Sequence, residues 1–544
     1  MSEGRNIDTH DTAVLIVGGG PVGLSLAIEL ARLGVPATLV EVRDGTIDAP
    51  KMNFVNVRSM EFIRRWDLTR EVREAGHPPD FHPNVRWATA VTGFEIASLD
   101  LPPLHEQKTA RVSPAYDCLV SQYWFDPILL ADARTRASIA LRHLTRLQSF
   151  RAIGSGIEAH LTDQTTGRDE TLTAQFIVGC DGAGSTIRQQ LGIGLTGLPE
   201  MQRNFHVFFR STELIDIYER ALGETRFLSL VGPGRVWGVL TSINWRGLWR
   251  FAMHPPPEDK AEVPDLIRKA VGAEFEFELL NEAHWSSPKL VADAFGRGRA
   301  FLAGDAAHQL NPSGGFGLNT GLGDAMDLAW KLAAVVDGWG GASLLESYEV
   351  ERRPIAVRNV EEATLNLRRE QGFAPGDAID QDSEEGAVHR AAFRQSLFDA
   401  DVMRHHDTDG IALGYRYDGS PVICPDGTAP RTDEVRDYHP TTRPGHRAPH
   451  AWIDDGRSML DLFGNGLTLL SFGGPADASV AFSRAAETRG VPLTVVPVSQ
   501  PEIAELYERR LVLVRPDGHV AWRGDEAPGD AGAVIDVVRG AAVE

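Results

Sequence analysis

Apolar runs in the first 195 residues alternate with amphipathic helical stretches. The run Ala13–Val17 leads into a helical pattern from Pro21 to about Leu33, and a second apolar run, Ala37–Val40, follows. A further apolar run covers Phe176–Cys180. Short apolar strands separated by helices are typical of an α/β domain built on a parallel sheet. We therefore predict such a domain at this end of the chain.

Residues 204–254 follow a different pattern, in which aromatic and β-branched residues form short runs. Turn residues separate these runs, which are Asn204–Arg210, Arg226–Val231, Val236–Ile243 and Leu248–Met253. The pattern predicts an antiparallel sheet inserted into the α/β domain. Beyond it, helical spacing predicts a long helix from about Asn319 to Asp337, ended by Gly338, and then a charged helix, Tyr348–Arg369, interrupted by Pro354.

The C-terminal residues predict a small α/β unit of thioredoxin-like type. Strand 467–472, helix 476–489, strand 492–498 and a hairpin around Asp517-Gly518 follow one another. No cysteine follows Cys424, so this unit has no Cys-x-x-Cys pair and no thiol redox chemistry. The expected domains are a discontinuous α/β domain of residues 1–195 and 285–370, a sheet domain of 196–284 that part of 75–120 joins, a linker region of 371–450 and the thioredoxin-like domain of 451–544.

Charge and composition limit the partners and the compartment. The formal net charge of −21 argues against nucleic acid or an anionic membrane surface as a partner. We find no apolar run long enough to span a membrane, and the polar first dozen residues do not resemble a signal peptide. The cysteines Cys118, Cys180 and Cys424 show neither pairing nor metal spacing. We expect a cytoplasmic protein without a metal site, and the sequence leaves open whether it forms a homodimer.

A glycine fingerprint lies between the first strand and the first helix. It has the form G-x-G-x-x-G and consists of Gly18, Gly20 and Gly23, with Pro21 and Val22 between the last two. The second strand ends at Glu41. The glycines allow a pyrophosphate to approach the helix N-terminus, and the acid can accept both hydroxyls of an adenosine ribose. The fingerprint predicts FAD or NAD rather than NADP as the tight ligand, an exclusion that Arg43 weakens slightly.

Two further strand ends carry glycine and aspartate. One strand ends in Asp181-Gly182, and a later one ends in Gly304-Asp305 before a loop that contains Gly315 and Gly317. This loop opens the long helix, whose N-terminus carries free N–H groups and a partial positive charge that stabilises an anion. The anion that we expect here is the pyrimidine edge of a reduced flavin ring.

Two polar residues lie between the first and second motifs. Arg58 leads a helix that extends to about Trp66, and its planar guanidinium suits a pyrophosphate. Gln122 lies just before an apolar helix, whose N-cap and first residue we place at Asp126 and Pro127.

Together the three motifs resemble those of the group A flavoprotein monooxygenases, the family of para-hydroxybenzoate hydroxylase and phenol hydroxylase. The resemblance spans the whole chain, because the phenol hydroxylase branch also carries a thioredoxin-like C-terminal domain without the redox pair. Within the family, the stretch DGTIDAPKMNFVNVRSMEFIRRW (residues 44–66) looks like that of nitrocatechol and chlorophenol monooxygenases and of rebeccamycin-type tailoring flavoproteins.

The resemblance implies a Rossmann-like FAD-binding domain and a set of cofactor contacts. FAD would be bound tightly but not covalently, and NADPH or NADH would act as a transient reductant. Gly18, Gly20 and Gly23 would hold the pyrophosphate, Glu41 the ribose and Asp305 the ribityl chain. The remaining contacts implied are Arg58 and Gln122 beside the cofactor, Leu318 and Asn319 at the flavin pyrimidine, and Asp181 and Gly182 near both FAD and NAD(P)H.

The implied reaction is hydroxylation of a phenolic or polyphenolic substrate by O₂ through a flavin C4a-hydroperoxide. A phenol reacts best as its phenolate, so the site needs a group that removes or stabilises the phenolic proton. The position that matches the active-site aspartate of phenol hydroxylase is Asn53, and an amide is not a base at neutral pH. Either another group takes the proton, with His206 a weak candidate, or the substrate is an electron-poor nitro- or chlorophenol or a natural-product intermediate. Pro312 would lend a carbonyl to the substrate site.

Aromatic residues of the inserted sheet are further candidates for contact with the substrate. They are Phe208, Trp237, Trp249 and Phe251, although sheet aromatics more often belong to the core. Which of them face inward depends on the register of the strands, because a shift of one residue would turn every side chain to the opposite face.

Three competing functions remain. A flavin-containing protein could sequester an aromatic intermediate with little catalysis, and no residue excludes it. A flavin-dependent halogenase is disfavoured because the W-x-W-x-I-P motif is missing: Trp245 and Trp249 lie too far apart. A plain NAD-dependent dehydrogenase would leave the Gly304-Asp305 loop without a purpose.

Overall fold

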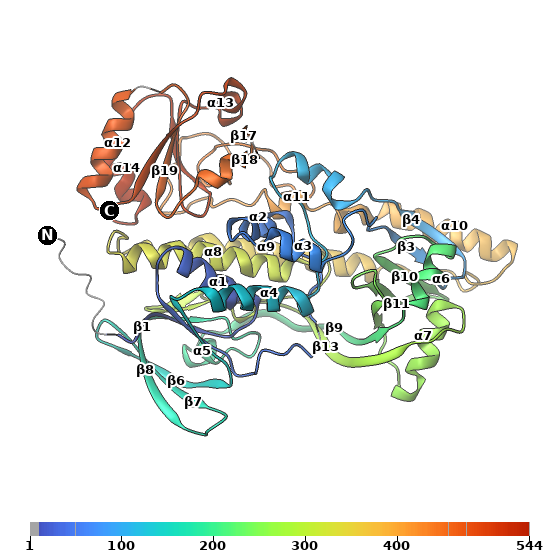
Figure 1. Cartoon of the computed structure of the whole chain (residues 1–544). Coiled ribbons are helices and arrows are strands. Elements are labelled where there is room, and N and C mark those ends of the chain that lie inside the picture. The colour runs from blue at the N-terminus through green and yellow to red at the C-terminus, as the bar shows by residue number, and fades with distance from the viewer. Residues whose placement is uncertain (1–9, 49, 455, 475, 543–544) are drawn as a thin grey trace.

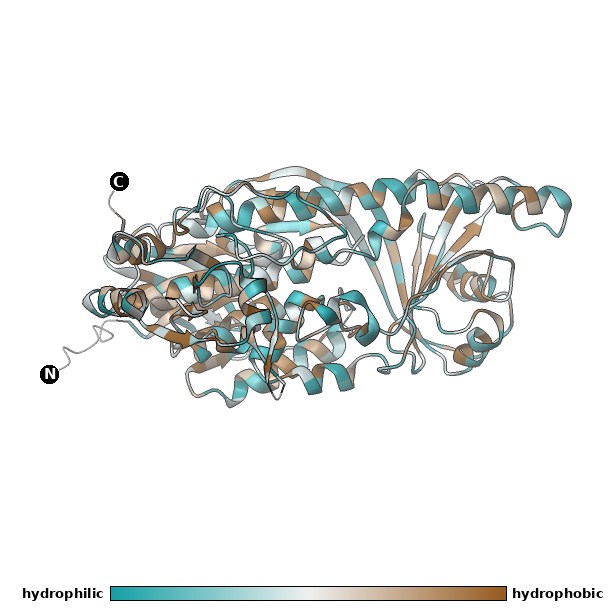
Figure 2. Ribbon diagram, turned by 90° about the horizontal axis from the view of Figure 1, so that it is seen from above, coloured by the Kyte–Doolittle hydropathy of each residue, from teal (hydrophilic) through white to brown (hydrophobic). Residues whose placement is uncertain are grey.

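The computed structural model describes residues 10–48, 50–454, 456–474 and 476–542. Two eight-stranded sheets and a four-stranded sheet form its framework. The long helices α8 (Phe316–Val336) and α9 (Ser347–Gln371) lie between the first sheet and the C-terminal unit (Figure 1). Apolar residues, brown in Figure 2, concentrate on the strands and on the helix faces turned towards them. No helix of the described residues is long and apolar enough to cross a membrane.

The first sheet has the strand order β14-β15-β8-β1-β2-β5, and the β6–β7 hairpin extends it beside β8. Strands β8, β1, β2 and β5 are parallel, as is β15 beside β8. This arrangement confirms the α/β prediction. Its strands are β1 (Thr12–Val17), β2 (Ala37–Val40), β5 (Ile139–Arg142), β6 (Thr145–Ile153), β7 (Gly156–Asp163), β8 (Asp169–Gly179), β14 (Gly296–Arg297) and β15 (Ala300–Leu302). Its helices include α1 (Pro21–Arg32), α2 (Val57–Arg65), α3 (Thr69–Ala75), α4 (Gln122–Thr135) and α5 (Thr186–Gln190).

The second sheet has the order β16-β13-β9-β12-β11-β10-β3-β4. All its pairs are antiparallel except β10 with β3. The strands are β3 (Val85–Ala88), β4 (Glu95–Leu99), β9 (Leu195–Arg210), β10 (Phe227–Gly232), β11 (Arg235–Ser242), β12 (Leu248–Met253), β13 (Glu278–Ala292) and β16 (His308–Leu310). Helices α6 (Glu213–Ala221) and α7 (Val263–Val271) pack on one face and close an aromatic core.

The C-terminal unit contains a four-stranded sheet of order β20-β19-β21-β22. Its strands are β19 (Leu467–Ser471), β20 (Leu493–Pro497), β21 (Leu511–Val514) and β22 (Val520–Gly524), with β17 (Trp452–Asp454) and β18 (Arg457–Ser458) pairing separately. The last two strands form the predicted hairpin, and Gly518 in its turn has φ 84°. Helices α12 (Ala476–Thr488), α13 (Pro501–Tyr507) and α14 (Ala531–Val538) complete the unit.

Two prolines are tolerated inside helices where the sequence predicted a boundary. Helix α4 begins at Gln122, and the Ser121 hydroxyl, rather than Asp126, caps it by accepting from the Tyr123 N–H. Pro127 lies inside this helix. Pro354 likewise lies inside α9, which continues from Ser347 to Gln371 without a break. In both helices tertiary packing outweighs the proline's lost hydrogen bond.

The region of residues 371–450 contains more regular structure than its composition predicted. It forms α10 (Glu384–Asp399) and α11 (Asp409–Ala412). Phe393 and Leu397 of α10 pack against Val85 and Trp87 of β3, in a hydrophobic cluster that contains no residue of α7. The helix is therefore held by contacts with the second sheet, which an analysis of local periodicity cannot detect.

Candidate functional site

The glycines of the first motif are required by close backbone contacts. Gly18 has φ 111°, and a β-carbon there would lie 2.2 Å from the carbonyl oxygen of Cys180. A β-carbon at Gly23 would lie 2.0 Å from the Gly18 carbonyl oxygen. Gly20, at the N-cap of α1, has no such neighbour within 4 Å and faces open space. The loop is thus tight on the protein side and open on the side where a pyrophosphate approaches the helix.

Glu41 follows β2 beside this loop. Its two carboxylate oxygens accept the backbone N–H groups of Gly19 at 2.6 Å and Arg43 at 2.8 Å. These bonds hold the carboxylate at the strand end, where an adenosine ribose is bound in dinucleotide folds. The Arg43 side chain itself is exposed.

The third motif is packed directly against the first. A β-carbon at Gly304 would lie 3.0 Å from a Val22 methyl, and one at Gly321 of α8 would lie 2.7 Å from the same methyl. The two motifs therefore meet through glycines that allow α8, the Gly304 turn and α1 to approach. Asp305, in this turn, is exposed.

Asp324 of α8 holds the Gly304 turn through a hydrogen bond. It is fully buried and accepts the Gly304 N–H at 3.1 Å. Its oxygens also lie 2.7 Å from His308 Nε2 and 2.9 Å from Arg352 Nε. Burial alone would raise the pKa of Asp324, but His308 and Arg352 together hold it below the ordinary value. Asp324 was not predictable as a site residue, because it lies among the apolar positions of α8.

The glycine loop ahead of α8 is held by Asn319. Its side-chain amide donates to the Gly315 carbonyl at 2.8 Å and accepts the Asn56 N–H at 2.9 Å. The side chain thus ties the loop to the segment before α2, and Gly317 and Leu318 are partly exposed. Helix α8 begins at Phe316, three residues earlier than expected, because Gly315 takes a left-handed conformation with φ 70°. Pro312 is exposed at the tip of this loop.

Gln122 lies at the N-terminus of α4 and bridges two segments. Its side-chain oxygen accepts the Lys51 N–H at 2.9 Å, and its amide donates to Asp126 at 2.8 Å. Burial raises the pKa of Asp126 to about 7. The bond to Lys51 ties the N-terminus of α4 to the segment before α2.

The Asp181-Gly182 turn leaves one polar atom without a partner. Asp181 Oδ2 accepts the N–H groups of Thr186 at 2.7 Å and Ile187 at 3.2 Å, whereas Oδ1 is buried without a hydrogen bond among the described residues. Burial raises the pKa of this carboxyl group. An orphaned buried oxygen next to the open glycine loop, together with exposed Asp305 and the free N-terminus of α8, fits a dinucleotide with a flavin at its far end.

Arg58 has a different set of partners from the one predicted. Its guanidinium donates to Glu61 at 2.6 Å and to the Asp517 carbonyl at 2.7 Å, and its Nε lies 3.4 Å from the Tyr415 hydroxyl. The side chain is buried at the junction with the C-terminal unit. The structure therefore engages the guanidinium of Arg58 at this junction, and its contact with the pyrophosphate stays a prediction.

The four sheet aromatics divide between the two faces of the second sheet. Trp249 and Phe251 are fully buried under α6, where Trp249 stacks on Tyr218 at 5.1 Å. Trp237 packs edge-on against Phe251, with Lys269 of α7 over its ring. These three are core residues on the helix-covered face, which corrects the expectation that they contact the substrate. Phe208 lies on the opposite face, 1% exposed, against Tyr123 of α4.

Neither of the predicted catalytic side chains is a base. His206 Nε2 accepts the Trp285 indole N–H at 3.0 Å, and burial lowers the pKa of His206 to about 2. Its accepting nitrogen is occupied, so the weak assignment as a base is withdrawn. The Asn53 side chain is partly exposed and makes no hydrogen bond within the described part of the chain.

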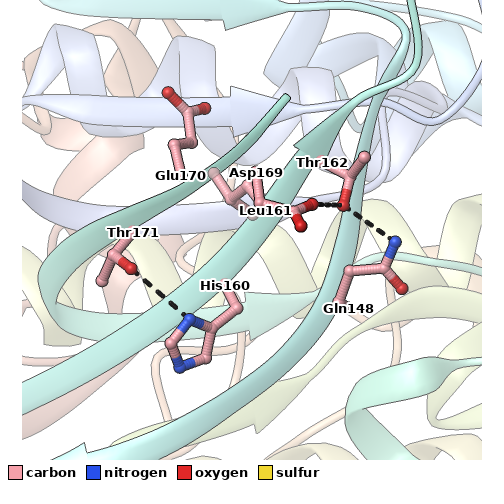
Figure 3. Close-up of a pocket in the computed structure, with 7 residues that line it drawn as sticks. All are labelled: Gln148, His160, Leu161, Thr162, Asp169, Glu170 and Thr171. Carbon is pink, nitrogen blue, oxygen red and sulfur yellow. Dashed lines mark hydrogen bonds between the residues drawn. The ribbon is translucent and has the colours of Figure 1, made fainter. Parts of the chain in front are cut away.

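A wide groove on the first sheet does not belong to this site. It encloses about 420 Å³ between β6, β7 and β8 and is drawn in Figure 3. Its polar side chains bond to one another: Gln148 donates to Thr162, which donates to Asp169 at 2.6 Å. None of the predicted site residues lines it. A much smaller cavity of about 20 Å³ lies under the start of α8, between Asn319 and Arg352, and has room for one water.

Comparison with known proteins agrees with this geometry. Residues 11–363 match the family model of the FAD binding domain, and residues 441–542 match that of the aromatic-ring hydroxylase C-terminal domain. A putative polyketide hydroxylase of Streptomyces halstedii is 34% identical over 95% of this chain and 94% of its own. The 4-methyl-5-nitrocatechol 5-monooxygenase of a Burkholderia species is 32% identical over 97% of both. The rebeccamycin biosynthetic enzyme RebC, solved with reduced flavin, is 41% identical and superposes with a TM-score of 0.91 over 98% of this chain and 99% of its own.

The chain belongs to the family of FAD-dependent aromatic-ring hydroxylases. This confirms the resemblance drawn from the three motifs, the para-hydroxybenzoate hydroxylase type of fold, FAD as cofactor and monooxygenase as the class of enzyme.

Proposed function

We propose that this protein uses NADPH or NADH to hydroxylate a phenolic substrate that reaches the site already acidic, such as a nitro- or chlorophenol or an acidic polycyclic phenol. The observation that carries this proposal is the lack of a base at either predicted catalytic position: Asn53 is an amide, and the accepting nitrogen of His206 is occupied. A phenol that ionises near neutral pH needs no such base. A small aromatic substrate, O₂ and a cytoplasmic location are parts of the same proposal.

The cofactor contacts in this proposal are residues of the three motifs, together with Gln122. FAD, when bound and reduced by NADPH or NADH, would activate O₂ for transfer of one oxygen atom to the ring. The residues that would hold it are Gly18, Gly20, Pro21, Val22, Gly23, Glu41, Gln122, Asp181, Gly182, Gly304, Asp305, Gly315, Gly317 and Leu318. Asn319 keeps the loop in place through its bonds to Gly315 and Asn56, and Pro312 would line the substrate side.

A substrate panel tests the proposal. NADH and NADPH oxidation by the FAD-loaded protein would be followed with phenol, chlorophenols, nitrophenols and hydroxynaphthalenes, and products identified by mass. We expect the acidic phenols to stimulate oxidation and to gain one oxygen atom. Equal rates with unsubstituted phenol would contradict the acidic-substrate proposal.

The same panel distinguishes hydroxylation from the alternative function, in which the flavoprotein only sequesters an aromatic compound. The absence of a base at Asn53 and His206 also suits a protein that holds an aromatic intermediate with little catalysis. Tight binding that perturbs the flavin spectrum, without stimulated NAD(P)H oxidation by any compound, would favour that alternative.

A further inference from the structure

Two partly buried arginines of the second sheet have no carboxylate partner among the described residues. Arg226 directly precedes β10, and Arg250 lies in β12. Within the described part of the chain neither forms an ion pair, and the Nε of each is buried without a hydrogen bond. Arginines that are fully buried are paired: Arg352 contacts Asp324 at 2.9 Å, and Arg515 contacts Glu351 at 2.6 Å. The two unpaired cations therefore need an explanation.

Arg250 lies on the face of the sheet that is turned towards the FAD-binding domain. It is directly opposite Phe208 in β9 and Thr241 in β11. Residues directly opposite one another in a sheet share a face, and Phe208 on this face contacts Tyr123 of α4. The only side-chain hydrogen bond of Arg250 among the described residues goes to the Thr241 hydroxyl at 3.3 Å.

Arg226 lies beside the loop that opens α8. Its guanidinium carbon is 5.0 Å from the centre of the Phe54 ring and 4.5 Å from that of Phe227. Phe54 in turn packs on Gly315, where a β-carbon would lie 2.9 Å from the ring, and its carbonyl lies 3.4 Å from the Asn319 amide. Two contacts thus connect Arg226 with the predicted flavin edge.

The surroundings of both arginines are short of negative charge. Burial lowers the pKa of Arg226 to about 9 and that of Arg250 to about 10, and the charge of Arg250 adds to the shift at Arg226. Asp117 is the carboxyl group that raises the pKa of Arg226, although the two groups are not within ion-pair distance. Burial also keeps His77 and His406, near Arg226, neutral, with pKa values of about 3. A cation that is partly withdrawn from water and lacks a counter-ion is destabilised, and an incoming anion would offset that cost.

We propose that Arg226 and Arg250 form an oxyanion subsite for the substrate, so that the preferred aromatic compound carries a carboxylate or a phenolate that is ionised at neutral pH. The guanidinium fork suits such oxygens better than an ammonium group does. The inference rests on the proposed function and deepens it, because it names the groups that hold the acidic substituent. It also accounts for a site without a base, since the two cations stabilise the ionised form.

The test compares matched ligands on the FAD-loaded protein at pH 7. The probes are 3-hydroxy-2-naphthoic acid, its methyl ester, 2,4-dinitrophenol and phenol, and binding is measured by calorimetry and by the perturbed flavin absorbance. We expect the acid to bind at least tenfold more tightly than its ester, and dinitrophenol at least tenfold more tightly than phenol. Preference for the acid alone identifies a carboxylate subsite, and preference for dinitrophenol alone identifies a phenolate subsite.

Variants assign the preference to the two arginines. Arg226→Gln and Arg250→Gln should each weaken binding of the ionised probes about tenfold and leave the ester and phenol unchanged. Arg226→Lys should fall between wild type and Arg226→Gln, because it keeps the charge but not the fork. Arg235→Gln is the matched control, since Arg235 is exposed at the start of β11.

Two results would overturn the subsite. One is equal binding of ionised and neutral probes by the wild type, and the other is a preference that survives in both glutamine variants with their FAD content intact. Failure of the proposed function looks different: the ionised probes would bind through the arginines but stimulate no NAD(P)H oxidation.

Discussion

His206 illustrates how a neighbour removes a titratable side chain from acid–base chemistry. Its accepting nitrogen is bonded to Trp285, and burial lowers its pKa to about 2. We therefore expect His206→Gln to keep kcat within about threefold of the wild type, with an unchanged profile between pH 6 and 9. Loss of a true general base would cost roughly 10²–10⁴-fold. A fall of that size with normal FAD content would contradict this account.

At the scale of elements, Gly321 decides how α8 meets the first motif. Helix propensity alone favours Gly321→Ala by about 1 kcal/mol. The new β-carbon would lie 2.7 Å from Val22 and 3.1 Å from the Gly304 α-carbon, so we expect a loss of about 1–3 kcal/mol in unfolding free energy and easier release of FAD. Urea denaturation and desalting measure both effects. Gly529→Ala, with no neighbour within 4 Å, is the control, and a stabilised Gly321→Ala protein would refute the packing argument.

The elements also show what the sequence could and could not predict. The fingerprint of β1, α1 and Glu41 was predictable because its turn, helix start and acid are local in the chain. The faces of the second sheet were not, because Trp249 and Arg250 are neighbours in sequence and only the partner strands decide which one faces the flavin domain. The partners of Arg58 were not predictable for a similar reason: Tyr415 and Asp517 lie more than 350 residues away in the chain.

At the scale of the whole molecule, buried charges join the C-terminal unit to α8 and α9. Arg515 contacts Glu351 at 2.6 Å and Asp327 at 3.1 Å, and Lys331 contacts the same two acids. Arg515→Met would leave these carboxylates underpaired in the interior, so we expect a loss of about 3–5 kcal/mol in unfolding free energy. Arg509→Met, which removes a half-exposed pair with Asp525, should change it by less than about 1 kcal/mol. Equal effects in urea denaturation would show that the buried network does not hold the unit.

A second junction, where Glu61 contacts Arg58 and Arg447, makes the folding stability depend on pH in the acid range. Burial would raise the pKa of Glu61, but Arg447 and Arg58 lower it from 4.5 to about 2. Because the folded-state value lies below the unfolded one, this group's contribution is complete above about pH 4.5 and is lost as the pH falls towards 2. We expect the free energy of unfolding to fall by about 3 kcal/mol over that pH window. The urea midpoint of Glu61→Gln should show a correspondingly flatter pH dependence, and an identical slope would contradict the assignment.

The most direct test of the central claim follows the oxygen atom. The FAD-loaded protein would be supplied with NADPH or NADH, ¹⁸O₂ and the phenol that best stimulates oxidation, and the product would be analysed by mass spectrometry. We expect one ¹⁸O atom in the hydroxylated ring for each nicotinamide oxidised in coupled turnover. A hydroxylated product whose new oxygen comes from water, or oxidation that yields only hydrogen peroxide with every aromatic compound tested, would contradict it.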